Sequence, residues 1–281
     1  MPIYDQGYRR YQARGPLRRI RFWPITREAL RMLLARRAFL LLLVGCWVHL
    51  VVRVIQIYVV TRFPEASRVL PIDGRLFGEF LNIQLGFGIL LSIFGGAGLI
   101  ANDLRTGAIL VYLSRPLSRR DYVIGKLSVL LALNLSVTLV PALCLYSVGL
   151  ALAPGQYAQW KLLWIGPAIL LYGTLESLVV SLIALAVSAL SRSARIAGIA
   201  FFGLLTALDI AHNVLRAMLR DPATALISVM SDLRVLGNAL FGIKDAALSV
   251  HWGLAALVLA LVSAGCLAVL RARVRAVEIV R

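Results

Sequence analysis

The sequence predicts an all-α membrane protein that crosses the bilayer with six helices. Of the 281 residues, 60% are hydrophobic and 15% are charged, whereas soluble domains carry about 25% charged residues. The mean hydropathy of +0.85 excludes a disordered chain. The apolar residues gather into six runs, and each run is close to the roughly 20 residues that a transmembrane helix needs.

The six predicted spans and their flanking segments form one transmembrane domain over residues 1–281. The spans are expected at residues 38–60, 80–101, 126–152, 162–190, 194–212 and 251–270. A basic segment, 1–37, precedes the six-span bundle of residues 38–270, and a tail, 271–281, follows it. The connection of residues 213–250 is mixed in character and is expected to hold one or two short helices at the outer surface.

The distribution of basic residues predicts the orientation. Twenty-one Lys and Arg residues fall on the side that holds both termini, ten of them before the first span, and eight fall on the other side. Because cytoplasmic loops carry an excess of Lys and Arg, both termini are expected in the cytoplasm. The net charge of +17 alone would also suit nucleic acid, but the hydropathy excludes that partner and favours anionic membrane lipid.

The N-terminal stretch PITREALRMLLARRAF, residues 24–39, is expected to form an amphipathic helix. Thr26 is a plausible helix cap, and Leu30, Leu33 and Leu34 then lie on one side. A helix that is apolar on this side and basic elsewhere favours the cytoplasmic interface of the membrane. The alternative is a soluble extension of the first span.

The motifs that would support an enzyme are missing from the sequence. There is no GxxxxGKS/T phosphate loop, no zinc-binding pair and no cluster of Cys and His. The glycine-rich stretch FGGAG, residues 94–98, lies within a predicted span, where small residues let helices pack closely. The sequence therefore indicates no metal site, no cofactor and no enzyme acting alone.

Ionisable residues at or within the predicted spans need an explanation, because charge in lipid is costly. They are Arg53, Glu79, Glu176 and Asp209. With a rise of about 1.5 Å per residue, Arg53, Glu176 and Asp209 share one level roughly 21 Å from the inner surface. We expect Arg53 to pair with Glu176 or Asp209, either fixing the helices or lining a pathway. The alternative is that these side chains reach the outer surface separately.

A compact charged segment, SRPLSRRDYVIGK at residues 114–126, separates the second and third spans. Ser118 followed by Asp121 matches a capping box, so a helix is expected to start at about Arg119. Pro116 would end any preceding helix.

The residues just before this segment, NDLRTGAILVYLS at 102–114, predict a short helix with Gly107 as its weak point. Ile109, Leu110 and Leu113 would form its apolar side. Two roles compete for the whole connection: a solvated loop that only orients the chain, or a docking surface for another protein. The helix–break–helix arrangement favours docking, because a loop that only orients the chain would not require it.

Residues 98–126 resemble the segment between the second and third spans of type-2 ABC transporter permeases. The matching positions are Asp103, Arg105, Gly107, Ser114, Arg115, Pro116, Ser118, Arg119, Gly125 and Lys126. The six-span layout, the basic entry helix and the long last connection agree with this family. The terminal RARVRAVEIVR is similar to the ends of its multi-gene-operon members.

The resemblance implies a permease subunit that works as a dimer, of identical or different chains, with a cytoplasmic ATPase that binds ATP and Mg²⁺. The matching positions, together with Arg120, would form a coupling helix and its flanks, seated in the ATPase. The expected activity is export across the bacterial inner membrane, of a substrate that the sequence does not identify. The alternatives are a secondary transporter or membrane-embedded enzyme that uses Arg53, Glu176 or Asp209, and a membrane scaffold that transports nothing.

Overall fold

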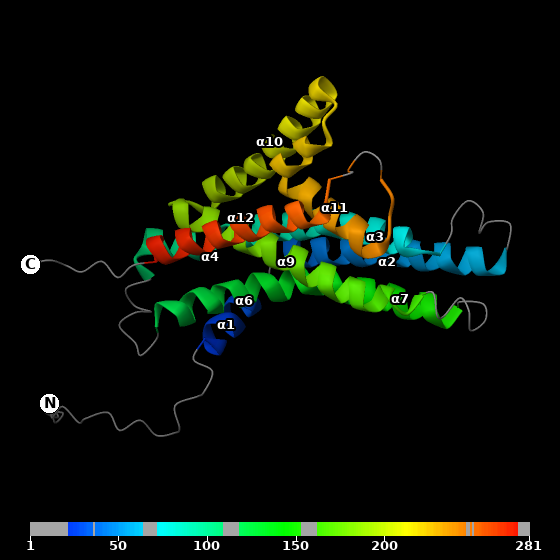
Figure 1. Cartoon of the computed structure of the whole chain (residues 1–281). Coiled ribbons are helices and arrows are strands. Elements are labelled where there is room, and N and C mark those ends of the chain that lie inside the picture. The colour runs from blue at the N-terminus through cyan, green and yellow to red at the C-terminus, as the bar shows by residue number, and fades with distance from the viewer. Residues whose placement is uncertain are drawn as a thin grey trace, which may run out of the picture.

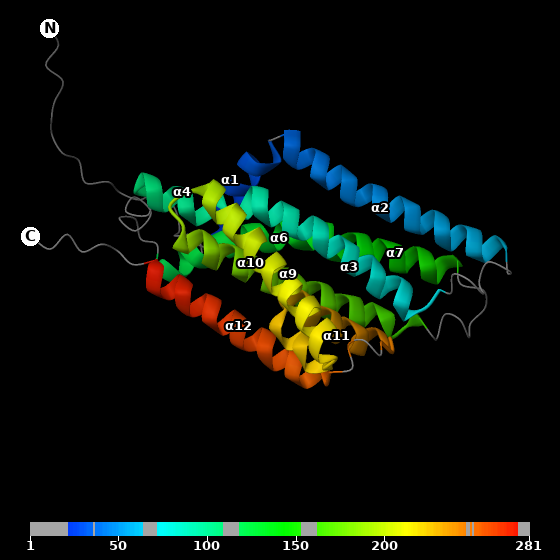
Figure 2. The ribbon, with the colours of Figure 1, turned by 90° about the horizontal axis from the view of Figure 1, so that it is seen from above.

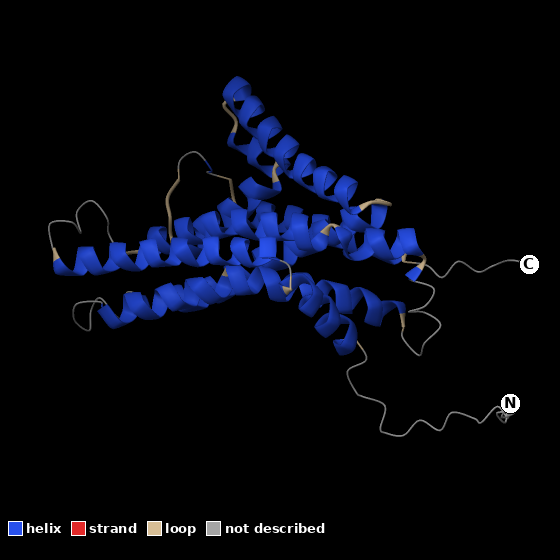
Figure 3. Cartoon of the chain, turned by 180° about the vertical axis from the view of Figure 1, so that it is seen from behind, coloured by secondary structure: helices blue, strands red, loops and turns tan. Residues whose placement is uncertain are grey.

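The computed structural model describes residues 22–35, 37–63, 72–108, 118–152, 162–245, 248 and 250–274. These residues form helices joined by loops, and none of them is in a strand (Figure 3). Six of the helices are long and apolar enough to cross a membrane, which confirms the predicted six-span, all-α fold. Five of them run roughly side by side, whereas the fifth span leans away from the others (Figures 1 and 3).

The observed spans agree with the predicted ones in number and order. They are α2 (Arg37–Arg62), α3 (Gly74–Leu91) continuing through the π-helix η2 (Ser92–Gly96) into α4 (Gly98–Thr106), α6 (Arg119–Val137) continuing into α7 (Leu139–Leu152), α9 (Ile165–Leu190), α10 (Ala194–Leu219) and α12 (Trp252–Arg273).

Three spans are clearly longer than hydropathy predicts: the second, the fifth, and the third, whose helix starts at Arg119 rather than at residue 126. The second starts at Gly74 because Asp73 caps it, accepting hydrogen bonds from the amides of Arg75 and Leu76. The fifth continues to Leu219, where Arg220 adopts a left-handed conformation with φ 53° and ends it. Charged side chains near these ends lower the hydropathy without interrupting the helix, so the apolar run underestimates its length.

Helix α9 forms the centre of the bundle. It contacts each of the helices α3, α4, α6, α7, α10, α11 and α12. Of its most apolar stretch, 72% of the residues are buried, against 17% for α2 and α12. The buried side of α9 is rich in Gly, Ala and Ser, and such small residues let neighbouring helices approach closely in a membrane.

Both interruptions in the second and third spans have local causes. In η2, an added Cβ on Gly96 would lie 2.8 Å from the side chain of Leu130, so the glycine allows α6 to pack there and FGGAG is a packing element. The third span breaks at Thr138, before Pro141, which has no N–H to bond to the carbonyl of Val137. The Cys46 thiol of α2 lies 3.2 Å from that carbonyl and donates a hydrogen bond to it.

Shorter helices cover two parts of the bundle. Helix α1 (Trp23–Leu34) confirms a helix before the first span, but Thr26 is not its cap. The helix begins three residues earlier, and the Thr26 hydroxyl is buried against α6 instead. Between α10 and α12, the 3-10 helix η3 (Pro222–Ile227) and α11 (Val229–Phe241) provide the predicted short helices.

Candidate functional site

A buried ion pair joins the end of α4 to the start of α6. The Lys126 ammonium lies 2.8 Å from Asp103 Oδ2, and the two side chains are 6% and 16% exposed. The Tyr122 hydroxyl donates a hydrogen bond of 2.7 Å to the same carboxylate oxygen. Lys126 also lies over the Tyr122 ring, 5.6 Å from its centroid. We call Asp103, Tyr122 and Lys126 the clamp, because they hold together the two helices that border the charged connection.

The helix ends on either side of the connection are defined by local chemistry. Gly107 ends α4 with φ 69°, a conformation that suits glycine because it has no Cβ. Ser118 starts α6 with the predicted capping box: its Oγ accepts from the Asp121 amide at 3.1 Å, and its own amide donates to Asp121 Oδ2 at 3.0 Å. The predicted helix start at Arg119 is therefore confirmed.

Helix α1 packs against the same turn of α6. The Thr26 hydroxyl donates a buried hydrogen bond of 3.1 Å to the carbonyl of Gly125. An added Cβ on Gly125 would lie 3.4 Å from Ile25 and from the carbonyl oxygen of Phe22. Gly125 therefore provides the flat surface on which α1 sits, a role different from the contact with another protein that the resemblance implies for it.

The structure separates the remaining predicted connection residues into two groups. Arg105, Arg119 and Arg120 are exposed at the ends of α4 and α6. Ser114, Arg115 and Pro116, with the apolar side of the expected short helix, lie outside the described residues.

Side-chain contacts connect α4, α6 and α1 at this end of the bundle. Asp103 belongs to the second span, Lys126 and Tyr122 belong to the third, and α1 rests on Gly125, the residue before Lys126. The second and third spans are therefore joined at this end by side chains that are largely removed from solvent.

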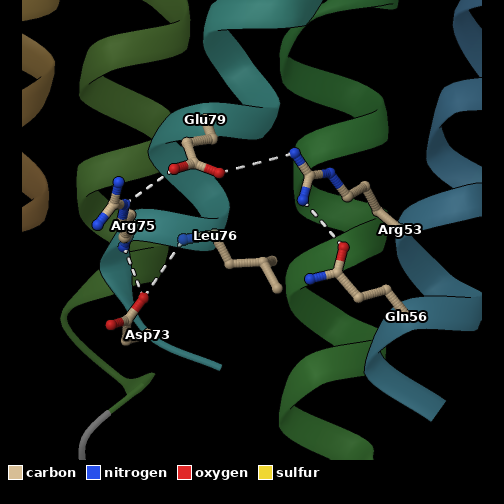
Figure 4. Close-up of polar contacts among 6 residues, drawn as sticks. All are labelled: Arg53, Gln56, Asp73, Arg75, Leu76 and Glu79. Atoms are coloured by element: carbon tan, nitrogen blue, oxygen red, sulfur yellow. Dashed lines mark hydrogen bonds and ion pairs between the residues drawn. The ribbon is translucent and has the colours of Figure 1, made fainter. Parts of the chain in front are cut away.

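The predicted pairing of the intramembrane charges is wrong. Figure 4 shows Arg53 of α2 facing Glu79 of α3, with 3.8 Å between Nη2 and Oε2, while its Nη1 donates to Gln56 at 2.9 Å. Glu79 also accepts a hydrogen bond of 2.9 Å from Arg75 one turn earlier. Arg53 therefore links the first span to the second, near the capped start of α3.

Glu176 and Asp209 lie apart from this pair. Asp209 accepts hydrogen bonds from Ser228 at 3.2 Å and from Asn213 at 3.4 Å. Glu176 is completely buried on α9, and neither of its carboxylate oxygens has a hydrogen-bond partner among the described residues. The count along each helix gives the depth of a residue but not the direction in which its side chain points, so it does not identify the partner.

Two sets of polar residues were missed by the sequence reasoning. Tyr122 completes the clamp, and only its position four residues before Lys126, on the same face of a helix, pointed to it. Asn134 of α6 lies in the bundle, where its amide donates to Ser92 at 3.1 Å and to Ser181 at 2.9 Å. An Asn in the middle of an apolar run is a signal for such a contact between helices.

Four membrane-crossing spans pack on the central span, α9, the remaining span α2 packs on the second and third, and a clamp joins the second and third at one end. This arrangement defines a polytopic membrane domain. The comparison with family models gives the family. The model described as ABC-2 family transporter protein matches residues 38–263, which is most of the chain. The chain therefore belongs to the ABC-2 transporter family and is a membrane subunit of such a transporter. Members are typically export permeases and are not themselves ATPases. A search of curated proteins found no match.

Proposed function

We propose that this chain is an export permease whose clamped connection, residues 107–118, receives the motion of a separate cytoplasmic ATPase. The observation that carries the proposal is the clamp itself. Asp103, Tyr122 and Lys126 hold the two flanks of the connection in fixed relation, and a docked subunit needs such a rigid point to move two spans at once.

The arrangement of the clamp favours docking over a loop that only orients the chain. Ten arginines before the first span already suffice to orient the protein, so orientation does not explain a buried ion pair at this connection. The ATPase would bind ATP and Mg²⁺, and the chain would serve as one half of a permease dimer. Family membership favours this function over a secondary transporter, a membrane-embedded enzyme or a scaffold.

The proposal includes an orientation and a domain organisation. The termini and the clamped connection would face the cytoplasm of a bacterium, with the spans in its inner membrane. Residues 1–37 would form a basic segment whose α1 lies at the membrane interface, 38–270 the bundle, and 271–281 the tail. The exposed Arg27 and Arg31 of α1 suit such an interface, because their side chains can reach the phosphates while Ile25 and Leu33 are buried.

The test begins with copurification. The tagged full chain would be extracted from its native membranes in mild detergent, and we expect mass spectrometry to find a bound chain with a Walker-type ATP site. ATP hydrolysis by the reconstituted complex is then compared for Arg115→Glu and Arg192→Glu. Arg192 is the matched control, because it is an exposed arginine in another connection on the same side.

Arg115→Glu should lower permease-stimulated hydrolysis by about tenfold, the equivalent of roughly 1.4 kcal/mol of lost coupling. Arg192→Glu should stay close to the unchanged protein. Absence of an ATPase after extraction, or equal behaviour of the two variants, would contradict docking at this connection.

A further inference from the structure

A basic pocket lies between the start of α6 and the end of α12, which adjoin at one end of the bundle (Figures 1 and 2). Its volume is about 610 Å³. The lining residues are three arginines, Arg119, Arg120 and Arg271, and five apolar residues, Val123, Ile124, Leu267, Leu270 and Val274.

The lining residues are arranged in layers along the helices. On α6, Arg120 is followed four residues later by Ile124, and on α12 Leu267 is followed four residues later by Arg271. Residues four apart lie on the same face of a helix, about 6 Å from each other along its axis. Since α6 enters the bundle here and α12 leaves it, both helices place the arginine at the end of the bundle and the apolar side chain one turn deeper.

The pocket is positively charged and therefore favours an anionic ligand. Three guanidinium groups line it, and no carboxylate is among the described residues that do so. The first turn of α6 adds the positive end of its helix dipole. The acid in that turn, Asp121, points back to the amide and hydroxyl of Ser118, where it completes the capping box.

The apolar layer formed by Ile124 and Leu267 favours an anion that also carries an apolar part. Ile124 and Leu267 are 44% and 37% exposed, and both lie within membrane-crossing helices. Inorganic phosphate or a nucleotide would use the arginines but would leave this apolar layer unused. A phospholipid places its phosphate and its acyl chains in the same order as the two layers.

We propose that this pocket binds an anionic phospholipid, with its phosphate at Arg119, Arg120 and Arg271 and its first acyl carbons against Ile124 and Leu267. Basic pockets between membrane helices are suited to such headgroups. The site ties α12 to α6 through a lipid, close to the clamp. It does not depend on the proposed ATPase, so either proposal can fail without the other.

The test measures lipid binding to the purified, delipidated full chain. Native mass spectrometry in neutral detergent would titrate phosphatidylglycerol and phosphatidylcholine against the protein and its variants. Arg271→Gln removes one pocket arginine. Arg273→Gln is the matched control, because Arg273 is exposed in the same last turn of α12 but does not line the pocket.

We expect phosphatidylglycerol to bind more tightly than phosphatidylcholine. Arg271→Gln should weaken the binding of phosphatidylglycerol about fivefold, which corresponds to about 1 kcal/mol for one basic residue at the membrane surface. Arg271→Lys should retain most of the affinity, and Arg273→Gln should retain nearly all of it. An Arg271→Gln protein that runs as a single folded species by size-exclusion chromatography excludes misfolding as the cause.

Four results would overturn the proposal. The first is equal affinity for the two lipids, and the second is an equal loss in Arg271→Gln and Arg273→Gln. The third is displacement of phosphatidylglycerol by millimolar inorganic phosphate, which would mean that the pocket recognises the phosphate alone. Loss of a copurified ATPase in Arg271→Gln with unchanged lipid preference would also overturn it, since the pocket would then be a protein-docking surface.

Discussion

Breaking the clamp should destabilise the protein far more than removing an exposed charge beside it. Lys126→Met leaves the Asp103 carboxylate in a site where it is only 16% exposed, although the Tyr122 hydroxyl still donates to it. Asp103→Leu removes an acceptor that Lys126 and Tyr122 share. Of the two changes, we therefore expect Asp103→Leu to cost more.

The magnitude follows from the burial and the short distances. Removing one partner of a buried ion pair costs about 3–5 kcal/mol, and the lost hydrogen bond of Tyr122 to a charged acceptor accounts for about 1.5–3 kcal/mol. Lys126→Met should cost about 3 kcal/mol and Asp103→Leu about 5 kcal/mol. The double variant should lose less than the sum, because two apolar residues replace the pair and leave no buried charge.

The assay is unfolding of the detergent-solubilised chain in a titration with dodecyl sulfate, followed by circular dichroism. Arg105→Met is the control, because it also removes one positive charge, and its side chain is exposed on α4 close to Asp103. Exposed substitutions of this kind usually change stability by less than about 0.5 kcal/mol. The same proteins are then compared for permease-stimulated ATP hydrolysis.

Two results would refute the reasoning about the clamp. If Lys126→Met were as mild as Arg105→Met, the pair would contribute little to holding the two helices. If the effects of Lys126→Met and Asp103→Leu were additive in the double variant, the two side chains would act independently, and the connection would lack the rigid base that docking requires.

Two further predictions concern α1 and α11. Gly125→Val should displace α1, because an added Cβ already reaches van der Waals contact with Ile25 at 3.4 Å and the two methyl groups of valine extend beyond it. Trypsin should then cut after Arg31 faster than in the parent, and an unchanged rate would contradict the packing. Burial raises the pKa of Asp232 on α11 to about 7. An unfolded carboxyl titrates near 3.9, so stability should fall as pH rises from about 4 to 7 and stay level above. Asp232→Asn should flatten this decline in the same unfolding assay, and an unchanged slope would contradict it.

Hydropathy was sufficient to predict the number and order of the spans. A helix must reach a minimum length to cross the bilayer, and the sequence shows this length as a continuous run of apolar residues. The ends of helices needed a different signal. The end at Arg119 was predicted because Ser118 and Asp121 form a capping box, whereas the start at Gly74 was missed because Asp73 lies outside the apolar run.

The partners of charged residues could not be predicted from depth. Arg53 and Glu176 lie at similar counts along their helices, but the partner of Arg53 is Glu79, one residue outside the predicted second span. Pairing depends on which helices are neighbours and on the direction of each side chain. Neither property is contained in the position of a residue along its own helix, and the packing of α2 on α3 decides it here.

The first two turns of α6 contact several different neighbours, which a motif written as a line of residues does not show. Successive residues of a helix point about 100° apart, so an eight-residue stretch presents all sides of the helix. Tyr122 and Lys126 point to Asp103 of α4, and Gly125 points to α1. The side that contributes to the basic pocket is formed by Arg119, Arg120, Val123 and Ile124.

Residues that are adjacent in sequence therefore lie on three different sides of α6 and make different kinds of contact. The resemblance assigns the whole motif to one partner, the ATPase. A motif lists residues in order and does not give the direction of their side chains. In three dimensions Lys126 and Gly125 are occupied within the chain, and they hold the helix that carries the exposed arginines. A variant of Lys126 or Gly125 should therefore change the position of α6 before it changes any contact with a partner, and the unfolding assay separates that effect from lost docking.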